Sequence, residues 1–375
     1  MIYNIFVFLI WLAALPFLAI FSLKKKYRKS LPARFFLFKN PPNSKSEIHF
    51  HACSLGEVKS IEPLLAHFED AAITVITNTG FAAARQITSN SRFLPFEWFL
   101  PFWLKKRKIL VVFEAELWLN LFKYSRKFGA YTVLLNARIS DKSYPKYLKF
   151  KPYYKKIFQN VDLVMAQSQK DKERLENLGA KNVEIWGNIK SANLPKITKN
   201  YPKFEYFTLT IASTHDGEEE LILSHLEAKN MKIILAPRHP ERFEKVHEIF
   251  SEFAMERGLS YERFSANLGL NSRCILLDTI GELVNFYRIS DAVILGGSFV
   301  PNIGGHNPAE VANFEIPLIN GKFYHNQTTL FEMVENVYFA DASEINSLLN
   351  SKLTPARIKN RFEMAKFVQF LKEKL

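Results

Sequence analysis

The stretch Ile48-His49-Phe50-His51-Ala52-Cys53-Ser54-Leu55-Gly56-Glu57 (residues 48–57) decides the fold class. A short strand leads through a turn of small residues into a helix, and this order is typical of parallel α/β proteins. Gly56 allows a tight turn, and Glu57 falls in the first turn of the helix. A carboxylate there either favours the helix dipole or serves as a general base at the carboxyl edge of the sheet.

The same alternation of apolar runs and amphipathic stretches continues along the chain. Helices are predicted between most of the strands, for example over 58–68 and over 169–178, where Gly179 ends the helix. The strands fall into two series, and each series predicts a Rossmann-like domain. The expected strands are 48–51, 72–77, 109–113, 132–135 and 163–166 in the first series, and 208–212, 232–236, 274–277, 292–295 and 317–319 in the second.

Two successive α/β domains predict a central cleft, onto which the carboxyl ends of the strands open. The segment 191–203 holds two prolines and few apolar residues and is typical of a linker. The resulting organisation has five parts, the last of them a helix that we expect to cross back onto the first domain. They are a membrane anchor over 1–23, an acceptor-binding domain over 24–190, a linker over 191–206, a donor-binding domain over 207–354 and the terminal helix over 355–375.

Composition excludes several classes of protein. The 375 residues carry a net charge of +13, and this excess lies in residues 1–190, whereas 191–375 are slightly acidic. A uniformly basic chain favours nucleic acid, but one basic half behind an apolar segment favours an anionic lipid surface, so no nucleic-acid partner is expected. Cys53 and Cys274 are far apart, which argues against a disulfide framework and against a zinc site built on thiolates.

Residues 2–22 are apolar except for Tyr3, Asn4 and Ser22, and they are long enough to span a bilayer. The basic run 24–29 follows directly, so the positive-inside rule places the rest of the chain in the cytoplasm. We therefore expect an uncleaved, single-pass anchor in a bacterial inner membrane. The alternatives are a cleaved signal peptide, which normally has its charges before the apolar run, and a helix lying in the membrane interface.

Polar clusters follow the predicted strands, and their convergence on one cleft favours a functional site over a purely structural role. In the first series the clusters are 113–118, 135–140 and 187–190. In the second series, 212–219 places hydroxyls where a helix N-cap is expected, and Arg238 in the cluster 236–242 can grip phosphate with a forked pair. The basic runs 105–108 and 146–156 are candidates for lipid phosphates or simply solvated surface.

Two glycine pairs, Gly296-Gly297 and Gly304-Gly305, let the backbone approach a ligand closely. A helix expected from Pro308 aims its first N–H groups at an anion, and Glu310 can hold ribose hydroxyls. The spacing fits neither a dinucleotide fingerprint nor a P-loop.

The ordered set of motifs resembles the 3-deoxy-D-manno-octulosonic acid (Kdo) transferases of lipid A biosynthesis. The strings Gly-Gly-His-Asn-Pro and Pro-Arg-His-Pro-Glu-Arg carry most of this resemblance. The matching segments are His51–Glu57, Glu114–Trp118, Asn136–Ser140, Gly187–Lys190, Ser213–Glu219, Pro237–Phe243, Gly281–Leu283 and Gly296–Glu310.

The resemblance implies a GT-B fold and an inverting transfer of Kdo from CMP-Kdo to a lipid A precursor, without metal or cofactor. Glu57 resembles the general base, and Glu114 and Lys190 resemble the groups that stabilise the transition state. Acceptor binding is expected at Ser54, Gly56, Arg138 and Ser140. Donor binding is expected at Ser213, Thr214, His215, Pro237, Arg238, His239, Gly281, Glu282, Leu283, Gly297, Gly304, Gly305, Asn307, Pro308, Ala309 and Glu310.

The chain departs from the family pattern at two positions. Ala309 replaces the usual leucine, which changes packing beneath the ribose more than chemistry, and Ala115 stands where threonine commonly separates Glu114 from Glu116. Two alternative functions share part of these features. Another GT-B enzyme, such as a UDP-sugar transferase or epimerase, has the same fold and donor loop. A non-catalytic, membrane-tethered protein that binds anionic lipid leaves the acidic clusters unexplained.

Overall fold

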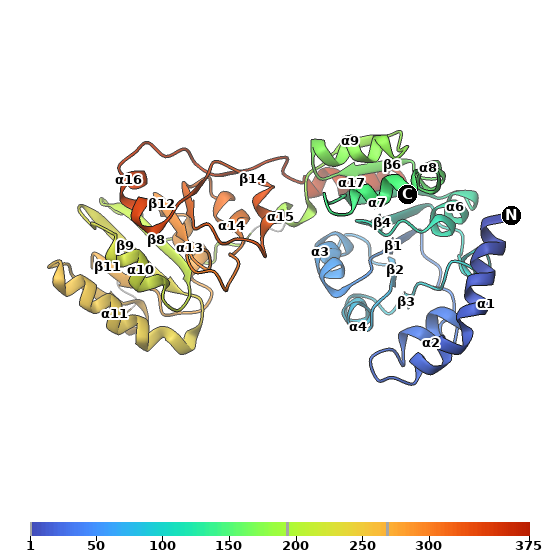
Figure 1. Cartoon of the computed structure of the whole chain (residues 1–375), viewed down its shortest axis with the longest axis horizontal. Coiled ribbons are helices and arrows are strands. Elements are labelled where there is room, and N and C mark those ends of the chain that lie inside the picture. Colours follow the sequence, from blue (N-terminus) through green and yellow to red (C-terminus); the bar gives the residue numbers. More distant parts are fainter. Residues whose placement is uncertain (1, 193–194, 268–269) are drawn as a thin grey trace. The chain divides into compact units, whose positions relative to one another are not determined.

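The chain folds into two compact units, each built around a parallel sheet (Figure 1). The structure, a computed structural model, describes residues 2–192, 195–267 and 270–375. The first unit comprises Met1–Asn193 and Asn360–Leu375, and the second comprises Leu194–Lys359. Two Rossmann-like sheets and an apolar N-terminal helix confirm the predicted fold class.

The first unit has a seven-stranded parallel sheet in the order β3-β2-β1-β4-β5-β6-β7. The order reverses between β1 and β4, which is the switch point where α/β sheets bind ligands. His51 of β1 pairs with Val112 of β4, so the loops after these strands leave the sheet at the same edge. The strands are β1 Ile48–His51, β2 Ala72–Val75, β3 Ser91–Phe93, β4 Ile109–Phe113, β5 Tyr131–Ala137, β6 Leu163–Ala166 and β7 Val183–Ile185.

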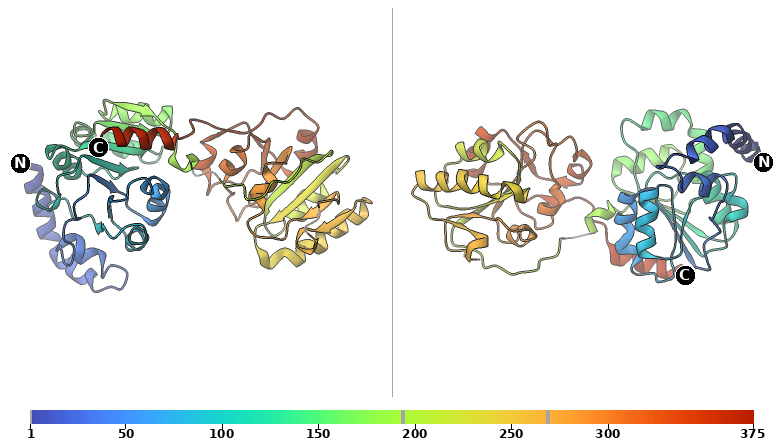
Figure 2. Two further views of the ribbon diagram at one scale, coloured as in Figure 1. Left: turned by 180° about the vertical axis from the view of Figure 1, so that it is seen from behind. Right: turned by 90° about the horizontal axis from the view of Figure 1, so that it is seen from below.

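Helices cover both faces of this sheet (Figure 2). Alternate residues of β4 enter different cores: Val111 lies in one apolar cluster and Val112 in the other. Burial on both faces explains why the central strands read as continuous apolar runs. The helices are α1 Ile2–Ser22, α2 Ser30–Phe35, α3 Leu55–Leu65, α4 Asn78–Ile87, α5 Leu100–Trp103, α6 Leu119–Lys127, α7 Tyr144–Lys149, α8 Lys151–Phe158, α9 Gln169–Asn177 and α17 Met364–Glu373, with a 3-10 turn at Ile189–Ala192.

The second unit repeats this design with the strand order β10-β11-β9-β8-β12-β13-β15, and its order reverses between β8 and β12. A short antiparallel pair, β14 Val334–Glu335 with β16 Arg357–Ile358, lies outside the main sheet. The main strands are β8 Phe207–Thr214, β9 Met231–Pro237, β10 Tyr261–Arg263, β11 Cys274–Leu276, β12 Ala292–Leu295, β13 Leu318–Asn320 and β15 Val337–Phe339. The helices are α10 Glu218–Ser224, α11 Phe243–Glu256, α12 Phe264–Asn267, α13 Leu283–Tyr287, α14 Pro308–Ala312, α15 Thr328–Phe331 and α16 Ile345–Leu349, with 3-10 turns at Pro240–Arg242 and Ala342–Glu344.

The last helix belongs to the first unit, where Phe367 and Leu371 are buried in the cluster that contains Phe50 of β1. The sequence starts this helix at residue 355, but the structure starts it at Met364, because the segment before it forms β16. Where the chain returns to the first unit it passes very close to Gly187. A Cβ built there would lie 1.6 Å from the carbonyl oxygen of Asn360, and the φ of +76° also favours glycine.

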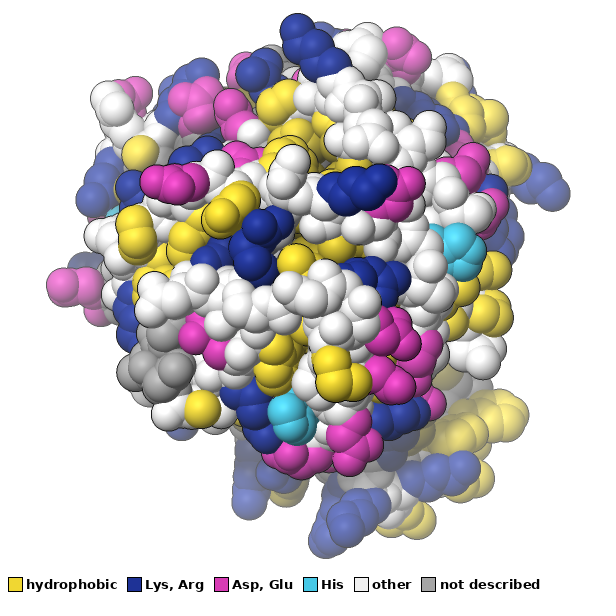
Figure 3. Space-filling view, turned by 90° about the vertical axis from the view of Figure 1, so that its left-hand side faces the viewer, with side chains coloured by type: hydrophobic (Ala, Val, Ile, Leu, Met, Phe, Trp, Pro, Cys, Tyr) yellow, Lys and Arg dark blue, Asp and Glu magenta, His cyan; other side chains and the backbone are white. Residues whose placement is uncertain are grey.

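One face of the second unit carries interspersed cationic, anionic and apolar side chains (Figure 3). A mixed surface of this kind is typical of a solvated protein body. It agrees with the slight net acidity of this half of the sequence.

Candidate active site

The turn after β1 holds Glu57 in a defined position. Ser54 is the N-cap of α3, and its side chain accepts a hydrogen bond from the backbone N–H of Glu57. The Glu57 carboxylate folds back over the turn, where it accepts hydrogen bonds from the backbone N–H of Cys53 at 2.7 Å and from the Ser54 hydroxyl at 3.1 Å. Gly56 faces open space, since no atom lies within 4 Å of a Cβ built on it.

The pKa of Glu57 is raised to about 7. Burial is the largest cause, the charges of Glu114 and Glu116 act in the same direction, and the hydrogen bonds from Cys53 and Ser54 oppose the rise. A carboxylate with a pKa near neutrality suits general base catalysis, because it accepts a proton readily while a substantial fraction stays ionised at neutral pH. A purely structural role, in which Glu57 only stabilises the start of α3, explains the two hydrogen bonds. It does not explain why Glu57 lies close to Glu114 and Glu116.

Glu114 directly follows β4, and Asn136 lies near the end of the neighbouring strand β5; both have left-handed backbones, with φ of 55° and 60°. Such conformations cost free energy in non-glycine residues and concentrate at functional sites. The Asn136 amide donates to Glu114 Oε1 at 3.2 Å and accepts from the N–H of Ile189 at 3.0 Å. Asn136 therefore ties the Glu114 loop to the segment that carries Lys190.

Burial raises the pKa of Glu114, and the positive charges of Lys190 and Arg138 oppose this rise. The three predicted catalytic side chains, Glu57, Glu114 and Lys190, thus interact at one edge of the first sheet. Arg138 joins them from the loop after β5. Ser140 lies further along that loop, where its hydroxyl donates to the Ser143 hydroxyl at 3.0 Å.

A second carboxylate, Glu116, has a different environment. The Trp118 indole donates to its Oε2 at 2.7 Å, and Nε2 of His51 lies 3.6 Å from the same oxygen. Burial alone raises the pKa of Glu116, but His51 and Trp118 outweigh burial and bring the pKa below its ordinary value. Neighbouring carboxylates with pKa values moved in opposite directions can divide the roles of proton acceptor and fixed charge.

Arg34 of α2 is a residue that the sequence analysis missed. Its Nε donates to the carbonyl oxygen of Leu94 at 3.0 Å. Burial lowers the pKa of Arg34 to about 10, against the nearby charges of Cys53 and Glu116. An arginine within the otherwise apolar run 31–38 was the available signal, but this segment precedes the first predicted strand, so no strand end pointed to it.

In the second unit, Glu218 joins two loops that the sequence placed in the donor site. Its carboxylate is fully buried and accepts four backbone N–H groups, from His215 at 2.8 Å, Gly297 at 2.7 Å, Ser298 at 2.9 Å and Phe299 at 2.8 Å. This clamp fixes the loop after β12 against the loop after β8. Glu218 lies in the predicted polar cluster 212–219, but nothing in the sequence pattern indicates this role.

The expected hydroxyl cap of the helix after β8 is wrong. Ser213 and Thr214 are still part of β8, and Gly217 is the N-cap of α10, with a φ of 83° and no side-chain cap. Ser213 instead adopts a left-handed φ of 57°, which turns the chain toward His215. A Cβ built on Gly296 would lie 2.8 Å from the carbonyl oxygen of Ser213, so only glycine allows this approach.

Three histidines gather beside Arg238 at the carboxyl ends of β8, β9 and β12. The Nε2 atoms of His215 and His306 are 2.9 Å apart, and the His239 ring packs edge-on against His215. The pKa of His306 is lowered to about 4, chiefly by burial and also by the charges of His215, Arg238 and His239. Burial likewise lowers the pKa of His215. His215 and His306 therefore act as neutral hydrogen-bonding groups, and Arg238 supplies the positive charge.

A cavity of about 330 Å³ lies next to this cluster and collects much of the predicted donor set. Thr279 also lines it, and the buried hydroxyl of Thr279 has no hydrogen-bond partner among the residues that the structure describes. A polar atom in that state is a candidate ligand contact. The predicted residues around the cavity are Ser213, Pro237, Arg238, His239, Gly281 and Leu283.

Asn307, Pro308, Ala309 and Glu310 form the start of α14, as predicted. The Asn307 side chain caps the helix by accepting from the Ala309 N–H at 3.0 Å, and it donates to Glu310 at 3.2 Å. Burial raises the pKa of Glu310. Ala309 packs against the apolar cluster beneath the loop.

The glycines before α14 have left-handed backbones, with φ of 70° at Gly297, 87° at Gly304 and 90° at Gly305.

Glu282, which belongs to the predicted donor-binding set, has partners within the protein. It pairs with Lys199 and accepts hydrogen bonds from Tyr201 at 3.0 Å and from Asn285 at 2.7 Å. Its described contacts therefore hold the segment that enters the second unit.

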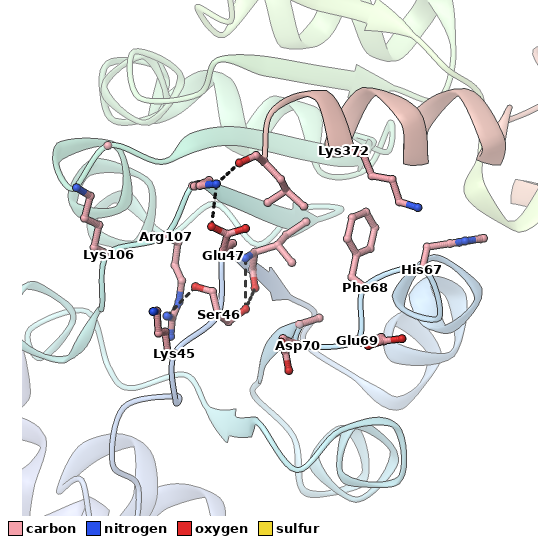
Figure 4. Close-up of a pocket in the computed structure, with 15 residues that line it drawn as sticks. Lys45, Ser46, Glu47, His67, Phe68, Glu69, Asp70, Lys106, Arg107 and Lys372 are labelled. Atoms are coloured by element: carbon pink, nitrogen blue, oxygen red, sulfur yellow. Dashed lines mark hydrogen bonds and ion pairs between the residues drawn. The ribbon is translucent and has the colours of Figure 1, made fainter.

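A larger cavity of about 1030 Å³ lies at the opposite edge of the first sheet, at the amino ends of β1 and β4 (Figure 4). Arg107 there donates to the carbonyl oxygens of Ser44 and Ser46, at 2.8 and 2.9 Å, and Lys108 pairs with Glu47 at 2.8 Å. These cations hold the start of the sheet together. The basic run 105–108 is thus separated from Glu57 by the length of the strands.

Comparisons with known proteins identify the family. Residues 29–193 match the family described as 3-deoxy-D-manno-octulosonic-acid transferase (kdotransferase). A 3-deoxy-D-manno-octulosonic acid transferase of Haemophilus influenzae is 34% identical over 391 residues, which cover 92% of this chain and 90% of that protein. The enzyme of the same name from Rickettsia bellii is 30% identical over 77% of this chain and 74% of its own length.

Among solved structures, the C-terminal CMP-Kdo binding domain of WaaA from Acinetobacter baumannii is 32% identical. It covers 38% of this chain and 78% of its own, with a TM-score of 0.35. Both relatives are matched over more than two thirds of this chain and of their own length. The chain belongs to the family of 3-deoxy-D-manno-octulosonic acid transferases.

Proposed function

We propose that this enzyme transfers Kdo from CMP-Kdo to a hydroxyl of a tetraacyldisaccharide lipid A precursor, with inversion at the anomeric carbon. The observation that carries the proposal is the cluster of Glu57, Glu114 and Lys190 at one sheet edge of a Kdo transferase family member, in which the two carboxylates are half-buried and the lysine is exposed. Glu57 is the base, and its pKa of about 7 fits that role.

In the proposed step, the acceptor oxygen bonds to the anomeric carbon of Kdo while the bond from that carbon to the CMP phosphate breaks. The acceptor proton moves to the Glu57 carboxylate, and both electrons of the broken bond leave with the phosphate oxygen of CMP. Lys190 and Arg138 balance the charge of Glu114, so this part of the site stays close to neutral while charge moves.

The donor is held in the second unit by the Arg238–histidine cluster and its 330 Å³ cavity. Arg238 pairs with phosphate, and the neutral His215 and His306 donate or accept hydrogen bonds to sugar and carboxylate oxygens. Glu310 and Asn307, which the resemblance gives to CMP binding, lie together at the start of α14. The scheme needs no metal or cofactor, because these side chains supply the charge.

We place the enzyme at the cytoplasmic face of a bacterial inner membrane, attached through α1. The acceptor is a lipid, and the basic residues of the first unit match an anionic leaflet. The sequence alone predicts a single pass for α1, with both units in the cytoplasm by the positive-inside rule. The polar contacts between the first turn of α1 and the first unit argue against that pass and favour a helix that lies at the cytoplasmic surface of the membrane. Nucleic acid has no part in this proposal.

A transfer assay tests the function directly. We expect the purified full-length chain, given CMP-Kdo and the tetraacyldisaccharide precursor in detergent, to release CMP and to raise the mass of the lipid by whole Kdo units. Mass spectrometry of the lipid also counts the units transferred. UDP-N-acetylglucosamine in place of CMP-Kdo is the control. Release of UDP with no gain from CMP-Kdo would support a UDP-sugar enzyme instead.

The transfer rate should depend on pH through Glu57. Its pKa is raised to about 7 in the folded protein, so the active ionised form is lost as the pH falls through that value. We expect kcat/KM to fall about tenfold per pH unit below about pH 7 and to level off above it. Initial rates between about pH 5.5 and about pH 8.5 measure this, and a flat profile contradicts the assignment.

A further inference from the structure

The inner face of α1 packs against the body of the first unit. Val7 is buried, Phe8 stacks on Trp98 with ring centres 4.6 Å apart, and the Trp11 indole donates to the carbonyl oxygen of Phe35 at 2.9 Å. Partly buried residues continue this stripe at helical spacing to the end of the helix, at Ala14, Leu15, Leu18 and Ser22. The helix therefore lies along the protein body over its whole length (Figure 1).

The first turn of α1 makes polar contacts with the core of the unit. The Tyr3 hydroxyl donates to Glu97, and the Asn4 side chain is hydrogen-bonded to Asn120 and Tyr124, both at 2.9 Å. Asn120 is fully buried, and its backbone N–H donates to Glu97 at 2.9 Å. Asn120 and Tyr124 belong to α6, and Glu97 lies in the segment before α5, so these partners cannot follow α1 into a bilayer without unfolding.

The outer face of α1 is a continuous apolar stripe that nothing in the described structure covers. Phe102 of α5, which is 76% exposed and packs on Trp98, extends it sideways. A continuous exposed apolar stripe of this kind, formed by many large side chains, marks an interaction surface. The stripe consists of Ile2, Ile5, Phe6, Leu9, Ile10, Leu12, Phe17, Ile20 and Phe21.

Cations lie at both ends of the stripe. The exposed run Lys24, Lys25, Lys26, Arg28 and Lys29 follows the last turn of α1. At the other end, Tyr3 contacts Tyr153 of α8, and exposed lysines of α7 and α8 surround the exposed Phe150 there. An apolar stripe between two groups of lysines is complementary to a membrane surface: the apolar side chains match the acyl chains, and the lysines match anionic headgroups.

We infer that α1 lies in the plane of the cytoplasmic leaflet, half immersed, and does not cross the membrane. The occupant of its outer face is lipid with anionic headgroups, and this inference rests on the proposed transfer to a membrane lipid. A spanning helix would carry Tyr3, Asn4 and their core partners away from the cytoplasmic side. An in-plane helix leaves every one of those contacts intact.

This orientation also places the leaflet beside the active site. Asn120, which holds the first turn of α1, is four residues after Glu116. The surface of the leaflet then runs past the loop that carries Glu114 and Glu116. The disaccharide headgroup of an acceptor can reach that loop while its acyl chains remain among the lipids.

The side on which the N-terminus lies tests the inference. A short Gly-Ser extension with one cysteine is added before Met1, and spheroplasts are treated with a membrane-impermeant maleimide. We expect labelling of the extension only after the spheroplasts are lysed. The unextended chain gives the background from Cys53 and Cys274, and the same extension placed after Leu375 is the matched cytoplasmic control.

Labelling of the N-terminal cysteine in intact spheroplasts would show a single pass and overturn the inference. Recovery of the chain as a soluble dimer after lysis would also overturn it, because a second copy would then cover the stripe. The transfer assay in detergent, run on the same extended chain, reports the proposed function separately. Loss of transfer with an unlabelled N-terminus would defeat the function and leave the orientation standing.

Discussion

Replacing Glu57 by glutamine is expected to lower the rate of Kdo transfer by about 10²–10⁴-fold, the usual worth of a general base. The amide has nearly the same shape as the carboxylate, but it cannot take the proton of the attacking hydroxyl. Its oxygen can still accept a hydrogen bond from Cys53, so the turn after β1 should keep its conformation. The measurement is kcat for transfer from CMP-Kdo at saturating acceptor.

Glu62→Gln is the matched control, because Glu62 lies on the same helix and is exposed. Glu62→Gln should transfer Kdo at the unsubstituted rate. Glu57→Gln should also lose the fall in rate below about pH 7, since the titrating group is gone, and it should still bind CMP. Transfer by Glu57→Gln within a few-fold of the unsubstituted enzyme would show that another group accepts the proton.

The central strands could be predicted because their physics is local. Buried on both faces of a parallel sheet, β4 and β6 are continuous apolar runs, and β1 alternates apolar residues with histidines; the structure places all three at the predicted residues. The edge strands β3, β7, β10 and β15 were missed. Each has only three residues, and β3, β7 and β10 also include an arginine or a glutamate, so neither length nor composition distinguishes those three from loops.

The candidate site divides in the same way. Polar residues directly after predicted strands, such as Glu57, Glu114 and Arg238, were found because parallel strands present their carboxyl ends at one edge. Arg34 reaches the carboxyl edge of the first sheet from α2, a helix that precedes the first strand, and no periodic pattern in the sequence predicts this placement. The contacts of Glu282 with Lys199 and Tyr201 depend on where the linker packs, which is a tertiary fact.

Glu218 is the residue whose role depends most on tertiary structure, and Glu218→Gln should have the second large effect. A carboxylate accepts all four N–H groups, whereas an amide turns its NH₂ toward two of them. Each buried donor left without an acceptor costs about 1–3 kcal/mol. We expect the free energy of unfolding of the second unit to fall by about 3–5 kcal/mol.

The same change should weaken donor binding. Glu218 itself does not line the donor cavity, but it holds His215 and Gly297, so its loss lets the loops after β8 and β12 separate. We expect the KM for CMP-Kdo to rise by an order of magnitude or more, with a smaller change in kcat for the protein that remains folded. Denaturant unfolding and steady-state kinetics on the same preparation measure the two effects.

Glu220→Gln is the matched control, because Glu220 is in the same turn of α10 and is exposed. It removes one first-turn charge from the helix and should cost at most about 1 kcal/mol. If Glu218→Gln and Glu220→Gln were equally stable and bound CMP-Kdo equally well, the loop after β12 would be held by its own backbone. The geometry gives the opposite expectation: Glu218 is fully buried, and its two oxygens accept four N–H groups, of which an amide in the same place leaves two without an acceptor.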